Sequence, residues 1–558
     1  MVSSQSSGNG QRRAAMEAYR LSRRGMLRAG VMGAGAVGFA SFLAACSSGS
    51  ESSGSPSPSA AGSLNPSAPP GTPGGSVTIA RAQDAQGFDK TMVFANSSIW
   101  VYVNFWETLT ISSTDGKSVE PWLAESWTQS DDQLTWTLKI KEGVKFADGT
   151  PMTSEDAKFT LDEARSTEGG WEFINSAIKT VSAPDPTTLV IETKYPWAPL
   201  LADLACPNNG IVPKDYGGRS KTDYYDAPMG TGPFMWDSWK KGQSITLKKN
   251  PNYWREDEKG TQLPYLDEVV WTVVPDTNSR NVQIQGGEVQ INETPPFSSI
   301  EQLQGSGKVD VTLFPSTRTD YVVMCQKTEF FKDQNVRLAV SHAIDRESLI
   351  KAVLYGNGTA ANSLFMPTLA YYDESTPGQS YDMDKAKAAL AASAYADGFS
   401  CTYAAASGDA VDAAIAQVLQ SSLKELGITM EIENVDPSAL HERQSNLDYE
   451  ISHTYWTMDI ADPDELVQFA VLPEGGGHSM VTGYEDPKAQ DLAKQAQQEF
   501  DTAKRQEIYS ELQKVLAESA FVAPLFYQPL PYATATNVQG FYVKPTGLYD
   551  MGVVSLTS

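Results

Sequence analysis

A long stretch of Ser, Gly, Pro and Ala divides this chain and limits what can fold on either side of it. From Ser47 to Gly75 almost no large apolar side chain occurs, so burial cannot offset the entropy cost of ordering the segment. We therefore expect residues 46–75 to form a flexible tether. Residues 76–558 remain, and they are too many for one hydrophobic core. Two or three domains are expected.

The segment before the tether has the order of parts expected of a lipoprotein export signal. Arg23 and Arg24 precede apolar residues, as in a twin-arginine signal. Residues 29–45 carry no charge, contain several glycines and are shorter than the ~20 apolar residues that a spanning helix needs. The sequence Leu-Ala-Ala-Cys that ends at Cys46 matches a lipobox. We expect residues 1–45 to be a signal peptide, and lipid on Cys46 to hold the protein on the extracytoplasmic face of the cell membrane.

Composition argues against several classes of partner. The formal net charge is −25, from 68 acidic and 43 basic residues. An acidic surface of this kind does not favour nucleic acid or anionic lipid as partners. After Cys46 only Cys206, Cys325 and Cys401 remain, so at most one intramolecular disulfide can form. No disulfide framework is expected to hold the fold.

Apolar residues recur with both strand and helix periods. Alternation over residues 134–140 predicts a half-buried strand, and a second run at Val144 and Phe146 before the Asp148-Gly149 turn predicts a hairpin. Thr153 precedes acidic residues and is expected to cap a helix. Three more helices are predicted over 336–344, after Asp345 and after Asp501. Strands and helices interleave, which indicates a mixed α/β fold.

Enzyme motifs are absent or lie in the wrong context. The G-x-G-x-x-G sequence at Gly33–Gly38 falls inside the predicted signal, where no βαβ unit can surround it, and neither G-x-S-x-G nor H-E-x-x-H occurs. The four histidines do not form H-x-x-x-H, so we predict no metal site and no cofactor. Carboxylate pairs are expected by chance in so acidic a protein, so a glycosidase has little support.

Several short motifs resemble those of one known family. They are Pro121–Trp127, Trp136–Leu138, Lys145–Thr153, Gly230–Phe234, Asn250–Trp254, Pro264–Val269, Asn335–Asp345 and Asp459–Pro463. Their joint order and spacing resemble family 5 extracellular solute-binding proteins, the peptide and nickel receptors of ABC importers. The resemblance covers nearly all of residues 76–558.

This resemblance implies an α/β, two-lobed periplasmic-binding-protein-like fold with an extra subdomain inserted in the first lobe. The implied first lobe comprises residues 76–98, 211–318 and 522–558, with the insertion at 99–210 and the second lobe at 319–521. A solute would be enclosed when the lobes close, and the closed form would dock on the membrane permease subunits of the importer. We expect a monomer and no enzymatic activity.

The resemblance also implies which residues contact the solute. In peptide-binding relatives the segment that matches Tyr455, Trp456 and Thr457 pairs with the ligand like an added strand, and Asp459 would receive the ligand's α-ammonium group. Phe94, Ala95 and Asn96 would face them from the first lobe. Some oligopeptide receptors carry a glutamate near these three residues, and this chain does not.

Alternative interpretations remain open on the sequence alone. Trp456 could belong to the core instead of the cleft. Asp459 could cap the turn before Asp462-Pro463. The solute is predicted to be a short peptide, with an oligosaccharide or another polar solute as the second choice. Nickel is disfavoured because the chain has only four scattered histidines, and a sensor lipoprotein that imports nothing is a third possibility.

Overall fold

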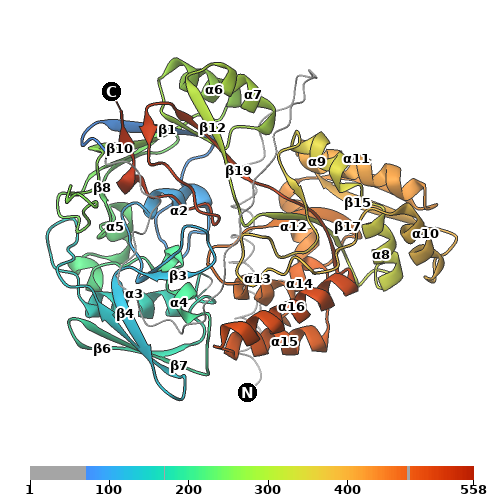
Figure 1. The fold of residues 1–558 in the computed structure, drawn as a ribbon, viewed down its shortest axis with the longest axis horizontal. Helices are drawn as coiled ribbons and strands as arrows, with labels where there is room; N and C mark the ends of the chain where they lie inside the picture. Colours follow the sequence, from blue (N-terminus) through green and yellow to red (C-terminus); the bar gives the residue numbers. More distant parts are fainter. Residues whose placement is uncertain (1–70, 169, 474–477, 558) are drawn as a thin grey trace, which may run out of the picture.

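The computed structural model describes residues 71–557, apart from 169 and 474–477, and arranges them in two lobes (Figure 1). The blue-to-green part of the chain forms one lobe and the yellow-to-orange part the other, while the red C-terminal segment returns to the first. The predicted signal, with Arg23 and Arg24, and the lipidated Cys46 lie outside the described residues. Within the described ranges, no helix is both long and apolar enough to cross a membrane.

A seven-stranded sheet forms the centre of the first lobe. Its strands are β1 (Ser76–Arg81), β8 (Phe234–Lys240), β9 (Ser244–Lys249), β10 (Glu268–Val273), β11 (Ile291–Glu293), β12 (Val309–Phe314) and β19 (Leu530–Ala535). The spatial order is β12-β19-β11-β1-β10-β9-β8, and β1 is parallel to both of its neighbours. The helices of these segments are α2 (Asn96–Tyr102), α5 (Lys221–Asp226), α6 (Thr277–Gly286) and α7 (Ile300–Gly305). Val77 and Ile79 of the central strand are fully buried.

A four-stranded antiparallel sheet forms the insertion. Its strands are β4 (Ala124–Gln129), β5 (Thr135–Ile140), β6 (Ile178–Asp185) and β7 (Thr188–Thr193), accompanied by the short pair β2 (Thr110–Ser112) and β3 (Val119–Pro121) and by α3 (Ser154–Ser166) and α4 (Leu200–Asp203). The strand predicted at 134–140 is β5, and Thr153 caps α3 as predicted. The hairpin predicted at the Asp148-Gly149 turn forms as a short one, with a single antiparallel bridge between Lys145 and Pro151. It does not extend the sheet, because β4 and β7 occupy both edges of β5.

A six-stranded sheet forms the centre of the second lobe. Its strands are β13 (Thr319–Met324), β14 (Thr359–Ala360), β15 (Ser400–Ala406), β16 (Thr429–Val435), β17 (Ile451–Trp456) and β18 (Val522–Tyr527), in the order β14-β18-β13-β17-β15-β16. Its helices are α8 (Gln334–His342), α9 (Arg346–Val353), α10 (Met383–Ala391), α11 (Ala410–Lys424), α12 (Pro437–Ser445), α13 (Asp464–Ala470), α14 (His478–Val481), α15 (Pro487–Gln498) and α16 (Thr502–Ser519). Asp345 and Asp501 cap α9 and α16, as the sequence predicted.

The chain passes between the lobes twice, and the two crossings touch. One crossing joins β12 to β13 and the other joins β18 to β19. The Gln528 N–H donates to the Arg318 carbonyl at 3.3 Å, and the Ser316 hydroxyl donates to the Gln528 carbonyl. The predicted boundary at 522 needs correction, because β18 pairs with β13 in the sheet of the second lobe. The return to the first lobe therefore follows Tyr527.

The start of the insertion also differs from the predicted residue 99. Helix α2 packs directly on the first lobe: the Arg81 guanidinium of β1 donates to the Ser97 carbonyl, and the Trp100 ring lies 6.5 Å from Tyr532 of β19 and 6.3 Å from Tyr549. The separate core of the insertion begins at Leu109 and ends at Ile211. Packing therefore moves α2 from the insertion to the first lobe.

Several motif residues meet at one buried carboxylate, that of Glu107. The indole N–H groups of Trp122 and Trp254 donate to it at 2.8 and 3.1 Å, the Thr231 hydroxyl at 2.7 Å and the Tyr253 hydroxyl at 3.3 Å. Burial raises the pKa of Glu107 from 4.5 to about 7, although these hydrogen bonds oppose the rise. These motif residues therefore join the insertion to the first lobe, and their role is structural.

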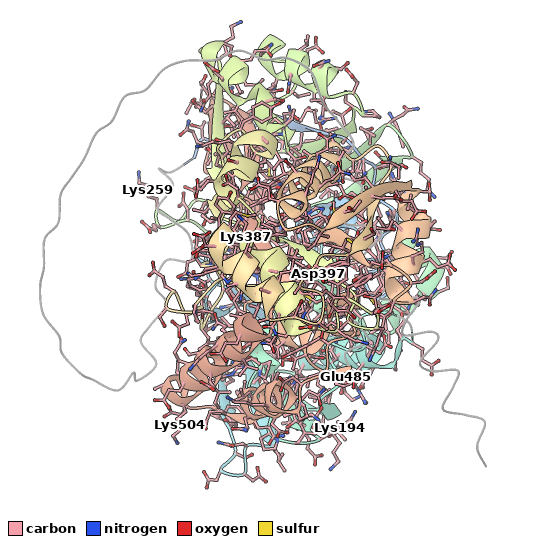
Figure 2. The ribbon with its side chains drawn as sticks, turned by 90° about the vertical axis from the view of Figure 1, so that its right-hand side faces the viewer. Lys194, Lys259, Lys387, Asp397, Glu485 and Lys504 are labelled. Carbon is pink, nitrogen blue, oxygen red and sulfur yellow. The ribbon has the colours of Figure 1, made fainter. Side chains whose placement is uncertain are left out.

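Charged side chains lie at the periphery. Figure 2 labels exposed examples on both lobes: Lys194, Lys259, Lys387, Asp397, Glu485 and Lys504. Cys206, Cys325 and Cys401 are buried and unpaired thiols, so the described part of the chain has no disulfide. Packing and hydrogen bonds alone hold the lobes together.

Candidate ligand-binding site between the lobes

A chain of four aromatic contacts connects the predicted first-lobe and second-lobe site residues. Phe94 stacks on Trp171 with ring centroids 4.7 Å apart, and Trp171 lies 5.9 Å from Phe173. Phe173 meets Phe469 edge-on at 5.8 Å, and Phe469 lies 4.6 Å from Trp456. The two predicted groups therefore lie on opposite sides of one interface.

Phe94, Ala95 and Asn96 form the start of α2. Ala95 is the N-cap residue, and its carbonyl accepts the first hydrogen bonds of the helix, from the Ser98 and Ile99 N–H groups. Phe94 and Ala95 are buried, whereas Asn96 is partly exposed. The three residues are consecutive in the sequence, and the start of α2 fixes the direction of their backbone.

The loop that carries Trp171 is held tightly against the segment before Phe94. The Trp171 backbone N–H donates to the Thr91 carbonyl at 3.1 Å, and its indole N–H donates to the Val93 carbonyl at 3.1 Å. A Cβ on Gly170 would lie 2.0 Å from the Thr91 oxygen, so only glycine permits this approach. These contacts hold the Trp171 ring against the Phe94 ring.

Tyr455 and Trp456 end strand β17, and they face different surroundings. The Arg318 guanidinium lies 3.8 Å from the centroid of the Tyr455 ring and also forms two 2.7 Å hydrogen bonds with Asp320. Trp456 is 4% exposed and packs in the large core cluster. Trp456 therefore packs as a core residue, which is one of the two interpretations that the sequence left open. Tyr455 and Thr457 remain partly exposed.

Asp459 lies in the turn that follows β17 and is 7% exposed. The turn is held by Glu465, whose carboxylate accepts the Asp459 N–H at 2.8 Å and the Ile460 N–H at 3.2 Å. Asp462 accepts the Asp464 N–H at 2.9 Å. These backbone N–H groups therefore donate to the carboxylates of Glu465 and Asp462 and not to that of Asp459.

The negative charge of Asp459 acts across the interface on two first-lobe groups. Burial raises the pKa of the Tyr102 hydroxyl and of the Cys206 thiol well above their usual values, and Asp459 adds to both shifts. Tyr102 ends α2, the helix that begins at the predicted first-lobe residues. Asp459 thus faces the first lobe.

A second contact between the insertion and the second lobe contains three carboxyl groups. The Trp197 indole N–H donates to Asp203 at 2.6 Å, and Arg505 binds Asp462 through two nitrogens at 2.5 and 3.0 Å. Burial raises the pKa of Asp464 to about 7 and that of Asp203 well above its usual value, and the neighbouring carboxylates add to both shifts. The arrangement stabilises the contact best when Asp203 and Asp464 hold protons.

Backbone contact accompanies this cluster. The Ala198 N–H of the insertion donates to the Gln497 carbonyl of α15 at 2.8 Å, and the Trp136 and Phe500 rings lie 6.1 Å apart. The insertion and the second lobe therefore touch beside the aromatic chain.

Sequence reasoning missed several residues at this interface: Tyr102, Trp171, Phe173, Arg318, Glu465 and Phe469. An aromatic pair in the loop after Gly170 could have drawn attention, because large apolar side chains in irregular segments need a partner. The others occupy ordinary positions in helices and strands, so no local signal distinguishes them. Their juxtaposition depends on pairings between distant segments.

No group of three or more His, Cys, Asp or Glu side chains gathers as metal ligands among the described residues. The His342 ring bonds to the Ser380 carbonyl at 2.8 Å, and the His453 ring lies 3.1 Å from Asp320. Both rings thus have protein partners, and the geometry gives nickel no support.

The sequence was also compared with known families and proteins. A model described as "Bacterial extracellular solute-binding proteins, family 5 Middle" matches residues 118–477. The Probable D,D-dipeptide-binding periplasmic protein DdpA of Escherichia coli K12 is 28% identical over 480 residues, covering 84% of this chain and 92% of DdpA. The glutathione-binding protein GsiB of the same strain is 28% identical over 436 residues, covering 76% of this chain and 83% of GsiB.

Solved structures agree with this likeness. The ABC transporter-associated periplasmic binding protein DppA from Helicobacter pylori, in complex with the peptide STSA, matches with a TM-score of 0.73 and 27% identity. The match covers 87% of this chain and 99% of that protein. The predicted two-lobed α/β fold is thereby confirmed.

Proposed function

Because the chain belongs to family 5 of the bacterial extracellular solute-binding proteins, we propose that it is the substrate-binding component of an ABC importer and that its solute is a short peptide. The family consists of receptors and not of enzymes, which fits the absence of enzyme motifs from the sequence. DdpA, GsiB and DppA are each named for, or bound to, a small peptide-like solute. The proposal extends that ligand class to this chain.

The buried carboxylate of Asp459 carries the peptide proposal. Asp459 lies in the turn after β17, and its charge acts on Tyr102 and Cys206 of the first lobe. An α-ammonium group supplies a positive charge and three donors, and it is present at the N-terminus of every unmodified peptide. Asp459 would receive this group, while Tyr455, Trp456 and Thr457 offer backbone groups to the peptide. Phe94, Ala95 and Asn96 would close the site from the first lobe.

An oligosaccharide or another polar solute is the second candidate. Phe173 and Tyr455 are partly exposed aromatic residues at this interface, of the kind that sugars stack on, and this observation alone favours it. A neutral sugar, however, has no ammonium group to bind at Asp459. A sensor lipoprotein that imports nothing would share the fold, and the absence of permease and ATPase genes beside this one would favour it.

Thermal-shift screening tests the proposed solute class. Di- and tripeptides with free amino termini are expected to raise the melting temperature of the protein, because a ligand that binds only the native state adds RT ln(1 + [L]/Kd) to its stability. At 100 times Kd this increment is about 2.7 kcal/mol. Cello- and xylo-oligosaccharides serve as the matched set and should produce no shift. Shifts with sugars alone would overturn the peptide proposal in favour of the second candidate.

We also propose that the protein works as a monomer tethered to the cell membrane by lipid on Cys46. Twin arginines, an uncharged apolar segment and a lipobox occur in the order that this processing requires. Two acyl chains suffice for stable anchoring without a spanning helix. The Ser/Gly/Pro-rich tether would then let the two lobes both capture solute and dock on the permease.

Replacing Cys46 with Ala tests the anchor. The variant is expected to leave the detergent-extractable membrane fraction, or to retain its signal peptide, because no sulfur remains to carry the lipid. Cys401→Ala is the control, since this buried thiol belongs to the second lobe. Fractionation followed by mass spectrometry of the N-terminal peptide measures the result. A wild-type N-terminal peptide that carries no lipid would contradict the proposal.

A further inference from the structure

Two fully buried first-lobe side chains near the Asp459 turn have polar atoms with no partner among the described residues. They are the Tyr102 hydroxyl and both polar atoms of the Asn208 amide. Tyr102 ends α2, and Asn208 lies in a single 3-10 turn, Pro207–Asn209. Leaving such groups unpaired costs stability, so a buried pair of them calls for an explanation.

The residue next to Asn208 shows that the fold can satisfy an amide at this place. The Asn209 amide donates to the Asp203 carbonyl at 2.8 Å and to the Asn175 side chain at 3.1 Å, and it accepts from Asn175 at 3.0 Å. Asn208 uses only its backbone, whose carbonyl accepts from the Lys90 ammonium at 2.9 Å. Its side-chain donor and acceptor stay available.

Tyr102 and Asn208 are linked to the Asp459 turn through Cys206. Lys90, which donates to the Asn208 carbonyl, precedes Thr91, whose carbonyl accepts the N–H of Trp171. Trp171 begins the ring contacts that run through Phe173 and Phe469 to Trp456. The Asn208 backbone N–H bonds to the Cys206 sulfur, and both Asp459 and Glu465 raise the pKa of that thiol, after burial itself. The unpaired groups therefore lie on the first-lobe side of the interface that Asp459 faces.

We propose that the Tyr102 hydroxyl and the Asn208 amide are first-lobe ligand contacts that hold the first peptide unit of a solute whose ammonium group binds Asp459. This inference rests on the proposed function. It adds which end of the solute the protein recognises, the amino-terminal end, and which chemical groups of the solute are bound there. A peptide group presents one N–H and one carbonyl, which an Asn amide matches with its carbonyl and its NH₂. A hydroxyl supplies one further donor.

The arrangement also explains how this solute would favour closure. Asp459 belongs to the second lobe, whereas Tyr102 and Asn208 belong to the first, so one amino-terminal unit would contact both. A ligand shifts the lobes toward the closed state only through contacts that exist in that state. The recognised class is accordingly a free α-amine followed by a peptide bond, which dipeptides and tripeptides share.

Tyr102→Phe and Asn208→Ala test the inference. Each variant removes polar atoms that have no partner among the described side chains, so the ligand-free melting temperature should stay the same or rise. Affinity for trialanine, and for the tightest-binding tripeptide of the thermal-shift screen, should fall about tenfold per variant by calorimetry. The same substitution at Tyr532 is the matched control, because this buried tyrosine also lacks a hydroxyl partner but lies in β19 near Arg81 and Glu293.

The outcomes separate the inference from the proposed function. If the wild type binds tripeptides and both variants bind them equally well, the inference is wrong and the peptide receptor stands. If Tyr532→Phe weakens binding as much as Tyr102→Phe, the loss is structural and the inference is also wrong. If the wild type binds no peptide, the proposed function fails and this inference fails with it. Tenfold losses confined to Tyr102 and Asn208 support it.

Discussion

Replacing Asp459 with Ala is expected to weaken binding of a peptide with a free amino terminus by at least about 100-fold. Removing one partner of a buried charge pair costs 2–5 kcal/mol or more, and each 1.4 kcal/mol is a factor of ten in Kd. An N-acetylated peptide carries no ammonium group, so its already weaker binding should change by less than about threefold. Calorimetric titration of both peptides against both proteins measures the difference.

Two further variants make this result specific. Asp459→Asn keeps the shape of the side chain and removes its charge, so it should lose most of the same affinity. Asp397→Ala removes an exposed carboxylate of the second lobe and should leave both affinities unchanged (Figure 2). Equal losses for free and acetylated peptides would remove Asp459 from the ammonium role. Melting temperatures of the ligand-free variants show whether the turn after β17 is intact.

Replacing Glu107 with Ala is expected to lower the free energy of unfolding by about 3–5 kcal/mol. The variant leaves the donors of Trp122, Trp254 and Thr231 without their acceptor in a buried site, and each such group costs about 1–3 kcal/mol. Since these donors come from both the insertion and the first lobe, their attachment to each other should weaken. Urea denaturation followed by tryptophan fluorescence measures the loss.

Two further variants serve as controls for the predicted loss of stability. Glu125→Ala removes a carboxylate whose ion pair with Lys139 is exposed to solvent, and it should change stability by less than about 1 kcal/mol. Glu107→Gln keeps the volume but cannot ionise. A loss below 1 kcal/mol for Glu107→Ala would show that solvent or a neighbouring side chain replaces the carboxylate.

The pKa of Glu107 determines the sign of the pH effect. The folded carboxyl group holds its proton until a pH of about 7, whereas the unfolded one releases it near 4.5. Its contribution to stability is therefore complete below pH 4.5 and is lost as the pH rises to 7. Relative to the wild type, Glu107→Gln should gain up to about 3 kcal/mol over that range. A constant difference between the two proteins would show that the pKa is not raised.

Much of this protein follows from local sequence. The alternation that predicts β5, the caps at Thr153, Asp345 and Asp501, and the ordered motifs are confirmed by the structure and the family comparison. These features depend on residues within one turn or one strand of each other. The site residues around Asp459 and Phe94, and the lipid on Cys46, remain predictions.

Errors arose where pairing between distant segments decides the outcome. The insertion was predicted to begin at residue 99, yet Arg81 of β1 bonds to Ser97 of α2, and Trp100 of α2 packs on Tyr532 of β19. The apolar run Val522–Tyr527 resembles the run at Leu530–Ala535, and only its pairing with β13 assigns it to the second lobe. A local pattern specifies that a strand forms but not which sheet it joins.

The sequence by itself predicted the export signal and the tether, and it determined the α/β character and the family, because each rests on composition, local periodicity or the order of motifs. Only the tertiary structure decided that Glu107 collects donors from three motifs, that Phe94 and Trp456 are joined through Trp171, Phe173 and Phe469, and that the polar atoms of Tyr102 and Asn208 are buried without a partner among the described residues. These residues are far apart in the chain. Their contacts exist because two sheets and an insertion are packed together, and such packing reflects the balance of burial and pairing over the whole molecule.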